Sequence, residues 1–252
     1  MTQVGNKEIE EETITERHNR ILSSITHDLK SPINAIISCA SLLNEKSRED
    51  FSDPMSGEFL KMILKAGHEA HSLVQGILTM AKMEAGKDKI EPELVFDIKG
   101  ELSETINTFR YEAEARNIKI IIEVENPLPV VRWDMKRLRL HALNNLISNA
   151  LKFSPSGGTI LVSAETDGNM VVLKVEDDGI GVPPEERERI FKRFEQVGLT
   201  STRVFKGAGL GLHNARMIVE RHGGDIYALD ATKGKGAAFV MLLPFTAEEP
   251  MR

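Results

Sequence analysis

The chain is organised around a polar histidine segment within a helical pattern, Ser24-Ile25-Thr26-His27-Asp28-Leu29-Lys30-Ser31-Pro32. One apolar stripe runs through and beyond it at helical spacing: Leu22, Ile25, Leu29, Ile36 and Leu43. The stripe places His27 on the opposite, solvent-facing side. A neutral imidazole is nucleophilic near neutral pH, and the Asp28 carboxylate can accept its Nδ1 proton. Taken alone, His27 is more simply interpreted as one surface histidine among seven, so its role depends on the rest of the chain.

The composition is typical of a globular protein with one large or two moderate domains. The 252 residues include 28% charged and 41% hydrophobic residues. The net charge of −6 argues against a dedicated nucleic-acid-binding protein. Cys39 is the single cysteine, so an intrachain disulfide is excluded and a reducing cytosol is expected. No signal-peptide pattern or membrane-spanning apolar run is found, so we expect any membrane segment to lie outside this chain.

The first part of the chain predicts a helical hairpin. Residues 46–57 have the composition of a loop, and a second helix follows with a heptad seam of Phe59, Ile63, Ala66, Ala70, Leu73, Ile77 and Met80. A second apolar row widens its face: Leu60, Leu64, Val74, Leu78 and Ala81. Two helices with such wide faces cannot close a core alone, so we predict that the hairpin dimerises into a four-helix bundle. His68 and His71 lack a further ligand cluster, which favours surface histidines over a metal site.

The second part predicts an α/β sandwich, with helices packed on one face of a sheet. We expect helices over residues 100–116, 135–153 and 211–221. Expected strands cover residues 94–98, 118–124, 130–133, 159–165, 171–176, 225–229 and 237–243. Asp167-Gly168-Asn169 predicts the turn of a hairpin.

Two glycine-rich stretches carry the signature of a nucleotide site. Asp177 follows a predicted strand and precedes two glycines. Its carboxylate can accept a hydrogen bond from an exocyclic amine, while glycines let the backbone approach a planar ring. The stretch Gly207-Ala208-Gly209-Leu210-Gly211-Leu212 opens a helix, whose N-terminal N–H groups can bind phosphate. Another helix offers amide oxygens for Mg²⁺ and a lysine for phosphate: Asn145, Asn149 and Lys152.

Two superficial matches are excluded. The His27 segment lacks the arginine of a protein-kinase catalytic loop, and neither a preceding glycine-rich loop nor a DFG motif accompanies it. The Gly207 turn is GxGxG rather than GxGxxG, and no Walker A sequence occurs. Neither a Rossmann nor a P-loop site is therefore indicated.

From about residue 18 to residue 245 the chain resembles the bacterial two-component sensor histidine kinases, in their cytoplasmic dimerisation and ATP-binding portion. The matching motifs are, in order, the H-box at 27–32, the N-box at 145–153, a glycine box at 177–181, the F-box at 191–194 and further glycine boxes at 207–212 and 234–236. The resemblance implies a Bergerat ATP-binding fold. It also implies a dimerisation and histidine phosphotransfer domain at 1–86, a linker at 87–93, a catalytic ATP-binding domain at 94–246 and a tail at 247–252.

The resemblance also implies roles for individual residues. His27 would take the γ-phosphoryl group on Nε2, with Asp28 as base, and pass it to an aspartate of a receiver domain on another chain. Asp177 would bind the adenine amine, Asn149 would coordinate Mg²⁺, and Lys152 would contact phosphate. The expected nucleotide-binding set is Asn145, Asn149, Lys152, Phe153, Asp177, Gly179, Gly181, Gly207, Gly209, Leu210 and Gly211, with residues 183–206 as a lid. The implied cofactors are ATP and Mg²⁺, the implied assembly is a homodimer, and the implied location is the cytoplasm, alone or as part of a membrane-bound sensor.

Four positions depart from the family pattern. Ser31 stands where the family commonly has Thr or Asn, a residue thought to position water for dephosphorylating the partner receiver domain. Serine keeps a hydroxyl that could do the same. At the other three positions, a frequent Asn is replaced by Asp178 and a frequent Thr by Ala208 and by Ala237. Each contact to the nucleotide that is lost in this way would weaken ATP binding by about 1 kcal/mol.

Two alternatives to an active kinase are a degenerate kinase acting as a dimeric scaffold and an ATPase that drives a clamp. The scaffold would not need the catalytic residues, and the clamp would not need a surface histidine on a bundle.

Overall fold

The computed structural model describes residues 29–43, 54–84, 89–193, 195, 209–232 and 234–246. The chain divides into two compact units, residues 1–78 and 79–252. Among the described helices, none combines the length and the hydrophobicity needed to cross a bilayer.

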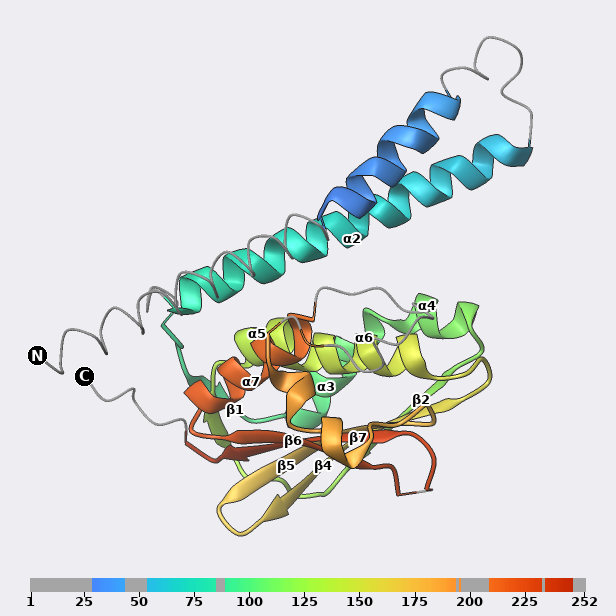
Figure 1. Cartoon of the computed structure of the whole chain (residues 1–252). Helices are drawn as coiled ribbons and strands as arrows, with labels where there is room; N and C mark the ends of the chain where they lie inside the picture. Colours follow the sequence, from blue (N-terminus) through green and yellow to red (C-terminus); the bar gives the residue numbers. More distant parts are fainter. Residues whose placement is uncertain are drawn as a thin grey trace, which may run out of the picture. The chain divides into compact units, whose positions relative to one another are not determined.

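Two long helices form a hairpin, one over residues 29–43 and α2, Pro54–Glu84, whose last six residues are assigned to the second unit (Figure 1). Cys39 and Ala66, one from each helix, are buried at 4% and 5% exposure. Four residues of the second apolar row on α2 are instead 41–63% exposed in the single chain: Leu60, Leu64, Val74 and Leu78. The helical hairpin is confirmed, and one apolar face of α2 is uncovered within the protomer.

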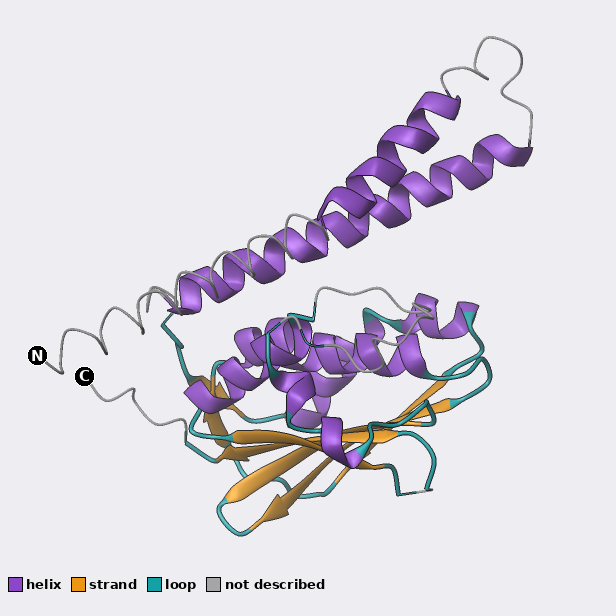
Figure 2. Cartoon of the chain, in the orientation of Figure 1, coloured by secondary structure: helices purple, strands orange, loops and turns teal. Residues whose placement is uncertain are grey.

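The second unit is a two-layer α/β sandwich, in which helices cover one face of a five-stranded sheet (Figure 2). The strand order is β2-β4-β5-β7-β6, with β2 parallel to β4 and every other pair antiparallel. These strands are β2 Lys119–Val124, β4 Thr159–Asp167, β5 Met170–Asp177, β6 Asp225–Asp230 and β7 Ala237–Pro244. A separate two-stranded sheet pairs β1, Glu93–Val95, with β3, Val131–Trp133. The predicted turn joins β4 to β5, where Asp167 pairs with Met170 and Gly168 has φ +58°.

The helices of this unit are α3 Ile98–Asn107, α4 Arg110–Ala115, α5 Met135–Arg137, a π-helical segment η1 Leu138–Leu143, α6 Asn144–Phe153 and α7 Gly211–Arg221. Two short 3-10 turns, η2 Pro184–Glu186 and η3 Arg189–Phe191, follow β5. The expected helix at 100–116 is wrong in its bounds, because the chain breaks near Phe109 into α3 and α4. Helix α3 also begins earlier than expected, since the Asp97 side chain accepts a hydrogen bond from the Gly100 N–H at 2.8 Å.

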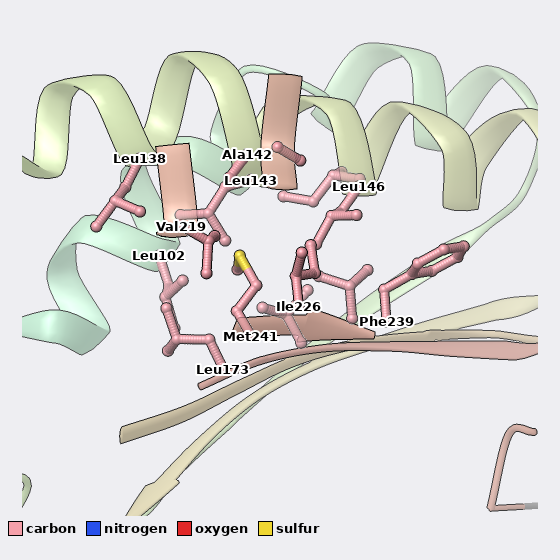
Figure 3. Close-up of a cluster of buried hydrophobic side chains, with 14 of the residues drawn as sticks. Leu102, Leu138, Ala142, Leu143, Leu146, Leu173, Val219, Ile226, Phe239 and Met241 are labelled. Atoms are coloured by element: carbon pink, nitrogen blue, oxygen red, sulfur yellow. The ribbon is translucent and has the colours of Figure 1, made fainter. Parts of the chain in front are cut away.

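The core lies between the helices and the covered face of the sheet (Figure 3). Apolar side chains of η1, α6 and α7 face alternate residues of the central strands. The residues labelled there are all at most 5% exposed: Leu102, Leu138, Ala142, Leu143, Leu146, Leu173, Val219, Ile226, Phe239 and Met241. This packing holds α6 and α7 firmly on the sheet, so the polar residues of these two helices are held in fixed positions.

Candidate nucleotide-binding site

Asp177 is the last residue of β5 and is only 4% exposed. Its Oδ1 accepts hydrogen bonds from the backbone N–H groups of Gly179 (2.8 Å) and Ala237 (3.4 Å). Burial raises the pKa of Asp177; the two N–H groups oppose this effect, and the nearby carboxylates of Asp178 and Glu176 add to it. With one oxygen held by the backbone, the carboxylate can accept a ligand amine at the other oxygen.

Glycines allow the backbone to close tightly around Asp177. A Cβ atom on Gly179 would lie 2.6 Å from Asp177 Oδ1 and 2.9 Å from the Phe153 carbonyl oxygen. A Cβ atom on Gly236 would lie only 1.7 Å from the Asp177 carbonyl oxygen. Gly181 and Gly236 have φ of +73° and +101°, in the region that favours glycine. The loops at 177–181 and 234–236 therefore meet at the end of β5.

Helix α6 carries four of the predicted site residues within nine positions. Asn145 and Asn149 are one turn apart and both are half-buried. The Asn145 Nδ2 donates to the His141 carbonyl at 2.6 Å. Farther along, Lys152 Nζ lies 5.0 Å from the centroid of the Phe153 ring. The π-helical segment η1 precedes Asn145, and such turns are frequent at functional sites.

The start of α7 lies against Asn145. A Cβ atom on Gly211 would be 2.7 Å from Asn145 Oδ1, so only glycine fits this contact without a shift. Gly209 has φ +65°, and Leu210 is buried at 2% exposure. The N-terminal N–H groups of α7 are thus placed next to the helix that bears the predicted magnesium and phosphate residues. Gly207 lies outside the described residues.

Glu176 belongs to this neighbourhood, although sequence reasoning missed it. Its carboxylate accepts hydrogen bonds from the Thr232 N–H (2.9 Å) and hydroxyl (2.8 Å), and Lys174 Nζ lies 3.3 Å away. Burial alone would raise the pKa of Glu176, but the bonds from Thr232 and Lys174 outweigh burial and lower it. Glu176 therefore ties the loop before Gly236 to β5. The only sequence signal was a glutamate beside Asp177 at the end of β5, two residues after Lys174.

The side chain of Asp178, one of the positions that depart from the family pattern, makes a contact within the domain. Its Oδ2 accepts a hydrogen bond from the Thr159 N–H at 2.8 Å. The side chain thus fastens the start of β4 to the loop after β5. Ala237 likewise takes part through its backbone N–H, which donates to Asp177.

The start of the predicted lid is anchored to α7. The F-box residue Phe191 is buried at 1% exposure, and the Arg216 guanidinium lies 4.3 Å from its ring centroid. Arg216 also pairs with Glu188 at 2.9 Å, while Arg193 Nε donates to His213 Nε2 at 3.0 Å. Lid residue 194 and residues 196–206 lie outside the described part of the chain.

The predicted phosphoacceptor pair, His27 and Asp28, also lies outside the described residues. Ser31 is half-buried on the first helix. Within the described ranges, no three His, Cys, Asp or Glu side chains gather as a metal-binding group. A magnesium ion bound mainly by nucleotide phosphates needs only one or two protein oxygens, and the amide oxygen of Asn149 is of the required type.

Two family models match the chain. Residues 17–86 match the His Kinase A (phospho-acceptor) domain, and residues 134–247 match the histidine kinase-, DNA gyrase B-, and HSP90-like ATPase. The first match contains the helix at 29–43 and α2, and the second contains the glycine loops, α6 and α7.

Several curated relatives of the chain are named as histidine kinases. The circadian input-output histidine kinase CikA of Synechococcus elongatus is 31% identical over 88% of this chain and 29% of its own length. The alginate biosynthesis sensor protein KinB of Pseudomonas aeruginosa is 34% identical over 87% of this chain and 36% of its own length. The chain thus spans less than half the length of the curated relatives it matches.

A solved structure agrees with these relatives. The crystal structure of full-length ShkA in complex with AMPPNP is 31% identical, with a TM-score of 0.63, and covers 92% of this chain and 47% of that chain. The family models, the relatives and the fold together show that the chain belongs to the two-component sensor histidine kinases, a family of ATP-dependent protein-histidine kinases, and contains their phosphoacceptor and ATP-binding core.

Proposed function

We propose that this core binds Mg-ATP, phosphorylates itself on His27 and passes the phosphoryl group to an aspartate of a response-regulator receiver domain. The observation that carries the proposal is the geometry at Asp177: a buried carboxylate with Oδ1 held by two backbone N–H groups. No described residue donates to its Oδ2, which can therefore accept the exocyclic amine of adenine. The complex of the relative ShkA with AMPPNP, an ATP analogue, supports the same ligand here.

The remaining residues of the site have complementary roles. Phe153 packs on the adenine ring, and the Lys152 ammonium neutralises phosphate charge. The N–H groups at the start of α7, after Gly207, Gly209 and Leu210, bind phosphate oxygens. The amide oxygen of Asn149, beside Asn145, holds Mg²⁺, which shields the charge of the phosphates.

In the transfer step, the His27 Nε2 attacks the γ-phosphorus while Asp28 accepts the Nδ1 proton. The new N–P bond forms as the bond to the β,γ-bridging oxygen breaks, and ADP leaves. Attack on the phosphohistidine by a receiver aspartate then regenerates His27. The Ser31 hydroxyl, four residues after His27 in the sequence, would position water for dephosphorylating the regulator, which is a further part of this proposal.

The proposal extends to assembly and boundaries. The uncovered row of Leu60, Leu64, Val74 and Leu78 on α2 supports a homodimer that closes a four-helix bundle. We propose domains at 1–86 and 94–246, with a linker at 87–93 and a tail at 247–252; the first family match, which ends at residue 86, supports this division. We place the core in the cytoplasm, where ATP is available.

The test is incubation of the purified chain with Mg²⁺ and γ-labelled ATP, beside His27→Ala and a matched control, His71→Ala, which removes an exposed histidine of α2. We expect acid-labile, base-stable label on the wild type and on His71→Ala, and none on His27→Ala. Nucleotide binding without label would favour the scaffold instead. Label that survives in His27→Ala would show that the acceptor is another residue.

A further inference from the structure

Arg116 lies outside every motif of the site but holds the end of the helix that carries Lys152 and Phe153. It caps α4, and its half-buried guanidinium reaches across to α6. One nitrogen, Nη1, donates to the Leu151 carbonyl, and Nη2 donates to the Ser154 carbonyl at 2.7 Å. The two acceptor carbonyls therefore flank Lys152 and Phe153 on either side.

The local sequence explains why α6 needs an outside donor. The Leu151 carbonyl would normally accept from the N–H four residues later, but that residue is Pro155, which has no N–H. Arg116 supplies the missing donor. Its positive charge also lies at the negative end of the α6 dipole.

The backbone of Arg116 completes the connection. Its carbonyl accepts the Ser156 hydroxyl at 2.8 Å and the Gly157 N–H at 3.2 Å. The same residue thus holds both the last turn of α6 and the loop that leads to β4. Because the Phe153 carbonyl lies against Gly179, a shift of this turn would also disturb the loop after Asp177.

We propose that Arg116 is a positioning residue of the nucleotide site, which sets the places of Lys152 and Phe153 through the carbonyls on either side of them. The inference rests on the proposed kinase function. A positioning role predicts weaker nucleotide binding with little change in the rate at saturation. A merely structural role predicts a smaller folded fraction, and hence a lower apparent rate, with unchanged affinity.

The experiment measures the dissociation constant of Mg-AMPPNP, and the KM and kcat of autophosphorylation, in the full chain. The variants are Arg116→Ala, Arg116→Lys and the matched control Arg110→Ala, which removes an exposed α4 arginine whose ion pair is with Glu114 on the same helix. For Arg116→Ala we expect the dissociation constant and KM to rise about tenfold, which is the equivalent of losing one charge-assisted hydrogen bond. We expect kcat to stay within about twofold of the wild-type value. Arg116→Lys should recover part of the affinity, and Arg110→Ala should match the wild type.

The folded fraction of each variant is measured by circular dichroism, and Arg116→Lys serves alone if the alanine variant does not fold. Wild-type affinity in Arg116→Ala and Arg116→Lys, or a fall in kcat at unchanged KM, would overturn the assignment of Arg116. Failure of the wild-type chain itself to bind Mg-AMPPNP would instead overturn the proposed function.

Discussion

Substitution of Gly236 by alanine provides a sharp test of how the Asp177 pocket is built. At φ +101°, an L-residue is strained whatever its surroundings. Its Cβ would also lie 1.7 Å from the Asp177 carbonyl oxygen. To reach 3.0 Å, the shortest separation that real Cβ atoms show, the two atoms must move apart by about 1.3 Å. Either the loop at 234–236 or the end of β5 has to move by that amount.

Gly234 is the matched control in the same loop. Its φ of +76° is also unfavourable for alanine, but a Cβ there meets no atom within 4 Å. Gly234→Ala should therefore cost only the backbone strain, about 1–2 kcal/mol in free energy of unfolding. Gly236→Ala adds the displacement beside Asp177 and its neighbour Ala237, whose N–H donates to the carboxylate. A misplacement of about 1 Å in a preorganised site can cost about 100-fold, so we expect a loss of that order in nucleotide affinity.

The assay is calorimetric titration with Mg-AMPPNP, together with urea unfolding of each variant. We expect affinity within about threefold of the wild type for Gly234→Ala and a loss of about 100-fold for Gly236→Ala. Equal affinity of the two variants would refute the reasoning, because it would mean that the contact with Asp177 does not constrain the pocket.

Three further predictions concern the carboxylates of this site. Asp177 must be ionised to accept the adenine amine, and its pKa is raised by burial, so nucleotide affinity should fall as the pH drops through a value above the usual range for aspartate. Asp178→Asn keeps an oxygen for the Thr159 N–H but removes a charge that raises this pKa, so titration with nucleotide at several pH values should show binding persisting to lower pH. Glu176 has a lowered pKa, so its stabilising effect is present above its unfolded pKa and is lost as the pH falls through its folded pKa. Glu176→Gln should lower the free energy of unfolding by about 1–2 kcal/mol at neutral pH, and urea unfolding should show this difference disappearing in acid; a difference that persists in acid would contradict this role.

Much of the fold was predictable because periodicity and turn chemistry are local. The alternation of apolar residues located most of the strands, and Gly168 marked the β4–β5 turn. The strand expected at 94–98 is wrong at its end, because β1 ends at Val95 and Ile98 begins α3. The break between α3 and α4 was not predictable, since a continuous helical pattern conceals a change of direction. The cap at Asp97 was detectable, because aspartate is a favoured N-cap residue whose side chain can accept a backbone N–H of the first helical turn.

The site was predictable only where function imposes special residue types. Glycines beside Asp177 are such a signal, because no other residue permits the backbone approach seen there. The bonds that Thr232 donates to Glu176 and that Arg116 donates to α6 are of another kind, since they join residues 56 and at least 35 positions apart. Such pairs follow from the topology of the sheet and leave no periodic trace in the sequence.

Helix α6 contacts each of the parts of the site that come from distant segments of the chain. The loop after Asp177 abuts its end through Gly179, and α7 begins against its first turn at Gly211. Arg116 holds its final turn through main-chain carbonyls. Because each contact involves a glycine or the backbone of α6, backbone packing fixes the spacing between the adenine-binding and phosphate-binding groups. Nucleotide affinity should therefore be more sensitive to added atoms at these glycines than to truncation of exposed side chains nearby.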